Sequence, residues 1–212
     1  MRLEGSEAGR LITNVTQPIL RTERLVMLPL SDEHLDLEAQ FDSDAEVLRY
    51  LWGRARSRDE VVASHAERME FGRQVAGLGY WMAFLSTENA GPPGEFIGLM
   101  MLPPDHADGR DCDPADAALG YRITRRHWGR GYASEASAAL LRHVFETVGV
   151  SKVVADTMAV NLGSRAVMEK VGMRYVRTYF VDFADPLPGS DQGEVLYEVT
   201  REEWLRGVGL PD

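Results

Sequence analysis

The chain has 212 residues and a formal net charge of −10, with 33 acidic side chains against 23 lysines and arginines. This length predicts one domain with a core large enough to fold without disulfides or a metal. A single cysteine, Cys112, excludes an internal disulfide and a cysteine-cluster zinc site. The acidic balance disfavours general nucleic-acid binding, because nucleic-acid phosphates would be repelled.

No apolar run approaches the ~18 residues that a membrane-spanning helix needs. Residues 1–10 contain two glutamates and no apolar segment typical of a secretory signal, so a cytoplasmic protein is expected. Residues 1–17 show no periodicity and predict a poorly ordered tail, which leaves 18–212 as a single domain.

The N-terminal third predicts one strand followed by helices. An apolar run at 24–30 predicts the strand. Three serines stand where helix caps are expected, two of them with a glutamate three residues later: Ser31, Ser43 with Glu46, and Ser57 with Glu60. We therefore expect three helix starts, of which the last leads into a helix near 58–74.

The remainder predicts an antiparallel meander and then alternating helices and strands. Strand-like runs at 80–85 and 95–102, joined by the turn-rich segment 89–94, predict a hairpin. The later expected elements are a loop at 103–114, strands at 117–124, 152–157, 173–183 and 194–200, helices at 132–148 and 163–171, and a short terminal helix from Thr200. This order is typical of a mixed α/β domain.

The segment 119–134 carries the clearest chemical signal. Four arginines lie close together in a chain that is otherwise acidic: Arg122, Arg125, Arg126 and Arg130. Gly129 and Gly131 permit a tight backbone turn, and the following helix presents free amides and the positive end of its dipole. Together they predict a pyrophosphate site. The alternative is a solvated turn whose arginines are incidental.

Two common phosphate-binding motifs fit poorly. No Walker A run is present. A dinucleotide fingerprint needs glycine or alanine where this chain has Ser134, although Asp156 stands near the place of a ribose-binding acid. Binding of a nicotinamide dinucleotide therefore stays a weaker alternative.

The run from Arg126 through His, Trp, Gly129 and Arg to Gly131 resembles the pyrophosphate loop of the GNAT superfamily of acyl-CoA N-acyltransferases. The motifs Leu119-Gly-Tyr, Asn161-Leu-Gly-Ser164 and Met168-Glu-Lys-Val-Gly-Met173 are similar to its RimJ/RimL-type branch, as is Arg21-Thr-Glu-Arg-Leu25. The resemblance spans roughly residues 19–206 and implies a central mixed, mostly antiparallel sheet flanked by helices, with an acyl-CoA cleft where two strands splay apart.

The resemblance implies direct transfer of an acetyl group from acetyl-CoA to a primary amine, either a protein N-terminus or a small molecule. It implies a cofactor site on one strand, the loop after it and a second loop: Tyr121, Ile123, Thr124, Arg126, Trp128, Gly129, Arg130, Gly131, Tyr132, Ala133, Asn161 and Ser164. Backbone N–H groups around Ile123 are expected to polarise the thioester carbonyl. Family members are often monomers or homodimers.

Asn161 and Ser164 are the expected catalytic residues, with Ser164 as the candidate acid. Both residue types also cap helices well, which is the structural alternative. Many members of the superfamily carry a tyrosine acid where this chain has Met168, which cannot donate a proton. Candidate bases are Asp116, Asp182 or water.

The missing tyrosine keeps a second hypothesis open, a catalytically silent module that binds acyl-CoA. Trp52 and Trp81 are expected to pack in the core or to line the acceptor side, and Trp128 is expected to be a packing anchor for the loop. His127 lies between arginines and is a candidate phosphate contact. The acidic cluster Asp105–Asp116, which contains Cys112, is a candidate attractant for a cationic acceptor; the alternative is an ordinary solvated loop.

Overall fold

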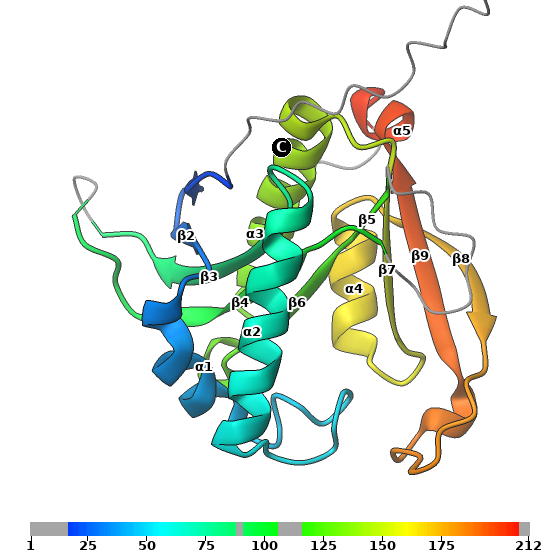
Figure 1. Ribbon diagram of the computed structural model, residues 1–212. Coiled ribbons are helices and arrows are strands. Elements are labelled where there is room, and N and C mark those ends of the chain that lie inside the picture. The colour runs from blue at the N-terminus through cyan, green and yellow to red at the C-terminus, as the bar shows by residue number, and fades with distance from the viewer. Residues whose placement is uncertain (1–16, 88–90, 106–115, 208–212) are drawn as a thin grey trace, which may run out of the picture.

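The computed structural model describes residues 17–87, 91–105 and 116–207 (Figure 1). Its strands are β1 (Leu20–Arg21), β2 (Leu25–Pro29), β3 (Gly79–Leu85), β4 (Phe96–Leu102), β5 (Asp116–Ala118), β6 (Gly120–Ile123), β7 (Lys152–Met158), β8 (Arg174–Tyr179) and β9 (Glu194–Thr200). Its α-helices are α1 (Leu35–Asp42), α2 (Arg58–Gln74), α3 (Tyr132–His143), α4 (Leu162–Lys170) and α5 (Arg201–Leu205).

The strands form two sheets that stand side by side (Figure 1). The first has the order β1-β2-β3-β4-β6, with every neighbouring pair antiparallel. The second has the order β5-β7-β9-β8, in which only β5 and β7 run parallel. The expected mixed, mostly antiparallel sheet flanked by helices is thus confirmed. Successive parallel βαβ units, which a dinucleotide-binding fold uses, do not occur among the described strands.

Apolar side chains alternate across the first sheet and bury both of its faces. On one face, Trp81 and Met100 pack with Leu140 and Leu141 of α3. On the other face, Met82 and Leu99 pack with Phe41 of α1 and with Met69 of α2. The helices α1 and α2 therefore lie on the opposite side of this sheet from α3 (Figure 1).

The strand expected at 117–124 is broken at Leu119 into β5 and β6. The first piece pairs with β7 and the second with β4, so one continuous segment joins both sheets. The Leu119 N–H donates to the Val154 carbonyl at 2.8 Å, and beyond that bond β6 and β7 are not paired. This break opens the gap between the two sheets.

Gly98 on β4 allows β6 to come close. A Cβ atom at this position would lie 2.1 Å from the carbonyl oxygen of Arg122 and 2.9 Å from the Cα of Ile123. Only glycine fits this spacing, since real Cβ atoms do not approach backbone atoms so closely. Gly98 therefore sets the position of β6, which forms one wall of the gap.

The expected helix start at Ser43 is wrong, whereas those at Ser31 and Ser57 are confirmed. The backbone N–H of Glu60 donates to Ser57 Oγ at 3.3 Å and the Ser57 N–H donates back to the Glu60 carboxylate at 2.7 Å. Ser43 instead follows α1, and its hydroxyl donates to the Gln40 carbonyl. Residues 44–53 then form successive turns.

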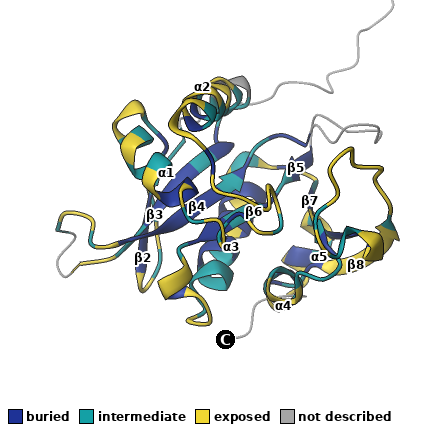
Figure 2. Cartoon of the chain, turned by 90° about the horizontal axis from the view of Figure 1, so that it is seen from below, coloured by how far each residue is buried: buried dark blue, intermediate teal, exposed yellow. Residues whose placement is uncertain are grey.

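The C-terminal elements follow the expected order with two changes. The α-helix that begins at Tyr132 passes into a π-helical turn at Val144–Val148. The strand expected at 173–183 ends earlier, as β8, which is exposed along most of its length at the edge of the second sheet (Figure 2). The terminal helix α5 begins at the expected Thr200 cap.

Three predictions concern residues outside this description: the tail, apart from Gln17; the loop around Cys112; and most of the loop at 103–114. No helix among the described residues is long and apolar enough to cross a membrane. The cytoplasmic location stays a prediction.

Candidate functional site

A cavity of 780 Å³ occupies the gap between β6 and β7. The segment 118–123 forms one wall, and residues 155–157 with α4 form the wall opposite. The loop that leads into α3 closes one end, and the turns at 46–51 close the other. The cavity thus has a loop end and a turn end, which differ in construction.

Two backbone amides of β6 face this cavity. The N–H groups of successive residues in a strand point to opposite edges, so those of every second residue point to the same edge. Since the Thr124 N–H donates to the Ile97 carbonyl on β4 and the Leu119 N–H donates toward β7, the amides of Tyr121 and Ile123 point into the gap. They form a row of donors along the wall, where a polar chain or a thioester carbonyl can be bound.

The loop end combines two glycines with the start of α3. Gly129 and Gly131 both have positive φ, at 71° and 79°. No atom lies within 4 Å of the place that a Cβ of Gly129 would take, so its backbone is open to a ligand. Gly131 precedes the first residue of α3, whose first amides have no partner inside the helix. This is the geometry that holds a pyrophosphate.

Side chains from distant elements fix the loop. Trp128 donates from Nε1 to the Ile123 carbonyl at 2.7 Å. On the outer side, the Glu135 carboxylate accepts from Thr22 Oγ1 at 2.5 Å and pairs with Arg24 at 2.5 Å. Arg24 also donates to the Arg130 carbonyl at 3.0 Å. Partial burial opposes ionisation of Glu135, but these hydrogen bonds hold its pKa below the usual value.

Most residues expected at the cofactor line the cavity together: Tyr121, Ile123, Trp128, Gly129, Gly131, Tyr132, Ala133, Asn161 and Ser164. Three others do not line it. Arg130 is exposed. Thr124 and Arg126 instead line a neighbouring pocket. The side chains of these three residues therefore do not reach into the gap between the sheets.

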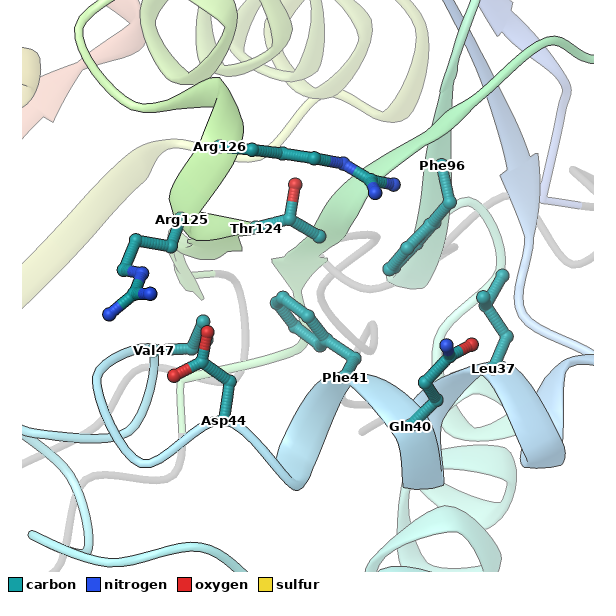
Figure 3. Close-up of a pocket in the computed structure, with 9 residues that line it drawn as sticks. All are labelled: Leu37, Gln40, Phe41, Asp44, Val47, Phe96, Thr124, Arg125 and Arg126. Atoms are coloured by element: carbon teal, nitrogen blue, oxygen red, sulfur yellow. The ribbon is translucent and has the colours of Figure 1, made fainter.

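That neighbouring pocket has a volume of 310 Å³ and lies against α1 (Figure 3). Phe41 and Phe96 form its apolar floor, and the Arg126 side chain extends over Thr124 (Figure 3). Arg126 pairs with Glu95 at 2.8 Å. The buried His127 contacts Thr124 Oγ1 at 2.6 Å and Glu95 at 3.4 Å. His127 also lines the large cavity, so it supports the loop and stays a predicted phosphate contact.

Tyr121 and Ser164 form a pair of hydroxyl groups across the cavity. The Tyr121 hydroxyl lies 2.9 Å from Ser164 Oγ and 2.9 Å from the Ser164 carbonyl oxygen. Burial raises the pKa of Tyr121 to about 12, against a smaller lowering by the Ser164 hydrogen bond. The phenol is therefore neutral at physiological pH and keeps a proton to donate.

Asn161 caps helix α4, which is the structural alternative to the catalytic role predicted from the sequence. Its Oδ1 accepts from the Ser164 N–H at 3.2 Å, and its Nδ2 donates to Thr157 Oγ1 at 2.9 Å. The amide thereby fixes the first turn of α4 and the position of Ser164. Asn161 also lines the cavity, so the capping and ligand-binding readings are compatible.

The carboxylates predicted as candidate bases do not line the cavity. Met168 is buried in the core. Asp116 is buried as well and pairs with Lys152 at 2.8 Å, outside the cavity wall. Asp182 is exposed in the segment after β8 and does not line the cavity. Among described residues, the carboxylates that do line it are Glu46 and Asp156, and neither is among the acids or bases predicted from the sequence.

The tryptophans divide between core and surface. Trp81 is fully buried and donates from Nε1 to the Pro18 carbonyl at 2.8 Å. Trp52 is half exposed and lies against the guanidinium of Arg56, at 4.9 Å from its ring centroid. Trp128 alone of the three lines the cavity.

Comparison with known proteins agrees with this geometry. Residues 24–174 match the acetyltransferase (GNAT) domain family. The chain is 36% identical over 198 residues to the FsC-acetyl coenzyme A-N(2)-transacetylase of Aspergillus fumigatus, a match that covers 92% of this chain and 81% of the relative.

Solved structures share the fold at lower identity. The RimL ribosomal L7/L12 alpha-N-protein acetyltransferase in complex with coenzyme A is 18% identical with a TM-score of 0.67, and the match covers 86% of this chain and 98% of RimL. Mycobacterium smegmatis RimJ in complex with CoA-disulfide is 17% identical with a TM-score of 0.65, over 88% of this chain and 90% of RimJ. The chain belongs to the GNAT family, and it is an N-acetyltransferase whose co-substrate is acetyl-CoA.

Proposed function

We propose that the chain transfers an acetyl group directly from acetyl-CoA to a primary amine, which is either a small molecule or a protein N-terminus. The single observation that carries this proposal is the cavity between β6 and β7, with backbone donors along one wall and a glycine loop at one end. We also propose that the chain lies in the RimJ/RimL-like part of the family, on the motifs around Trp128 and Asn161.

In the proposed arrangement the pyrophosphate binds at the amides after Gly129, because that backbone is unobstructed. The pantetheine chain then extends along β6, where the amides of Tyr121 and Ile123 face the gap. An amide that donates to the thioester oxygen would stabilise the negative charge that develops there during attack by the amine.

We propose Ser164 as the group that protonates the leaving thiolate, with Tyr121 as its hydrogen-bonded neighbour. Direct transfer needs one proton delivered to sulfur and one removed from the amine. The two hydroxyl groups lie 2.9 Å apart, and the Tyr121 phenol is neutral. For the amine proton we propose Asp156 or water, since Asp156 lines the wall opposite β6.

The experiment measures thiol release from acetyl-CoA with a panel of primary amines, for wild type and for Ser164→Ala and Tyr121→Phe. General acid catalysis contributes ~100-fold or more, so we expect kcat to fall by about that factor in Ser164→Ala and less in Tyr121→Phe. Tyr175→Phe is the matched control, because that hydroxyl bonds to Thr178 on the exposed strand β8. Wild-type kcat in Ser164→Ala would contradict the assignment.

A further inference from the structure

A cluster of buried charged side chains lies beside the turn end of the cavity, between α1, α2 and β6. Its members are Glu38 and Asp42 from α1, Arg56 before α2, His65 and Arg68 from α2, and Arg122 from β6. Glu38 and Asp42 are fully buried, and Arg122 is 6% exposed. Ionised groups are rarely buried to this extent unless each has a partner.

The two carboxylates are shared among the cations. Asp42 accepts from Nη1 of Arg122 and lies 3.3 Å from Nη1 of Arg56. Glu38 lies 2.5 Å from Arg68 and 2.5 Å from His65 Nδ1. The described contacts of these carboxylates therefore stay within the cluster.

The cluster has more positive than negative charge. Two carboxylates face three guanidinium groups, which leaves an excess of one positive charge even with His65 neutral. Asp32 reaches His65 at 3.2 Å, but its side chain is 91% exposed at the far edge. At the turn end of the cavity, Glu46 and Arg49 lie 3.7 Å apart and neutralise each other.

Arg122 connects this excess charge to the cavity. It belongs to the cavity wall, and its Nη2 is buried without a hydrogen-bond partner among the described residues. The centroid of the Phe41 ring, which also lines the pocket in Figure 3, lies 5.2 Å from the guanidinium carbon. Burial lowers the pKa of Arg122 to about 10, with Asp42 opposing this effect. The group is therefore charged at neutral pH and has an unused donor.

We propose that the acceptor is an aminocarboxylate, bound so that its carboxylate compensates the excess positive charge at Arg122 while its amine points to the thioester. A guanidinium matches the planar geometry of a carboxylate. The turns at 46–51 line this end of the cavity together with Arg122, so the carboxylate is expected to bind between them. This inference rests on the proposed acetyl transfer and names its substrate class.

The first test uses the wild-type chain and chain-length-matched acceptors: γ-aminobutyrate against n-butylamine, and ε-aminocaproate against n-hexylamine. A hydrogen bond between charged groups predicts a kcat/KM about 10-fold or more higher for the aminocarboxylate of a pair. Equal or higher kcat/KM for both alkylamines would overturn the inference and leave the acetyl transfer intact. No thiol release with any amine would overturn both.

The second test measures, in variants of Arg122, the ratio of kcat/KM for the aminocarboxylate to kcat/KM for the matched alkylamine. In Arg122→Gln the preference for the aminocarboxylate should fall to about 1, mainly through a higher KM, while Arg122→Lys should retain part of it. Arg58→Gln is the matched control, because this arginine pairs with Asp36 on the exposed side of the same helices. If Arg122→Gln fails to fold, Arg122→Lys and the wild-type pairs still decide the question. A preference retained in both Arg122 variants would overturn the assignment to this residue.

Discussion

The two ends of the cavity differ in the groups that line them: backbone amides at the loop end and charged side chains at the turn end. At the loop end the proposed binding groups are backbone amides, beside the positive-φ residues Gly129 and Gly131. At the turn end the wall is backed by charged side chains, with Arg122 held against Asp42 on α1. Backbone amides are the same in every sequence, whereas a charged cluster depends on each of its members. The loop end therefore suits a co-substrate common to a whole family, and the turn end suits an acceptor that differs between members.

The largest expected effect is at the turn end, in Asp42→Asn. This change leaves the buried Arg122 and Arg56 without their carboxylate, and breaking such a pair costs about 3–5 kcal/mol of unfolding free energy. Asp36→Asn is the control, since its ion pair with Arg58 is exposed and is worth at most ~1 kcal/mol. Urea unfolding of both variants checks the difference, and equal losses would show that the buried cluster is not stabilising the fold.

Gly98→Ala tests the wall that the two ends share. The new Cβ would meet the backbone carbonyl of Arg122 at 2.1 Å, so β6 must move away from β4. We expect a loss of about 3 kcal/mol of unfolding free energy together with weaker acetyl-CoA binding. Gly72→Ala in α2 is the control, because its nearest neighbour is at 3.9 Å. A stable Gly98→Ala variant with normal acetyl-CoA affinity would contradict the close approach of these strands.

A pH scan examines β7 and β9, which belong to neither end. Burial, and then the nearby Asp156, raise the pKa of Glu194 from its usual value of about 4.5 to about 7. Between these values the folded chain binds a proton that the unfolded chain does not, so stability falls as pH rises through this window. We expect a loss of about 2 kcal/mol from about pH 5 to about pH 8.

Glu194→Gln should remove that component, since glutamine does not titrate. Urea unfolding at both pH values measures the difference between wild type and variant. An unchanged pH dependence in Glu194→Gln would show that other groups are responsible.

The smallest expected effect on stability concerns Ser43 and Ser57, which are each followed by a glutamate three residues later. Ser57→Ala removes the side chain that caps α2 and should cost about 1 kcal/mol. Ser43→Ala should change the unfolding free energy by less than ~0.5 kcal/mol, because Ser43 is exposed and begins no helix. Thermal unfolding compares the two variants. Equal destabilisation would mean that the turns at 44–53 depend on Ser43 more than their hydrogen bonds indicate.

The loop end could be predicted from sequence because its signals are local. A tryptophan, two glycines and the start of a helix follow one another, and their spacing already predicts the backbone turn that the structure has there. The same holds for the cap at Ser57. At Ser43 an identical signal is overridden, since the Leu48 carbonyl accepts from the amides of residues 51–53 and the chain turns at Gly53, where φ is 63°.

The turn end could not be predicted, because its contacts are distant in sequence. Arg122 and Asp42 are 80 residues apart, and His65 and Glu38 are 27 apart. The break at Leu119 could not be predicted from the sequence either. Both halves of that segment have the pattern of a strand, and they differ only in the strands with which they pair. The pairing of Tyr121 with Ser164 likewise appears only once β6 and α4 face each other across the gap.

The most direct test of the account is calorimetric titration of the chain with acetyl-CoA, beside a variant that carries both Gly129→Asp and Gly131→Asp. The substitutions place acidic side chains at positive-φ positions in the loop, so we expect micromolar binding by wild type and an affinity at least about 100-fold lower in the variant. Dephospho-CoA and NADH serve as comparison ligands. Equal acetyl-CoA affinity in both proteins would contradict the loop as the pyrophosphate site, and tight NADH binding without acetyl-CoA binding would contradict the cofactor itself.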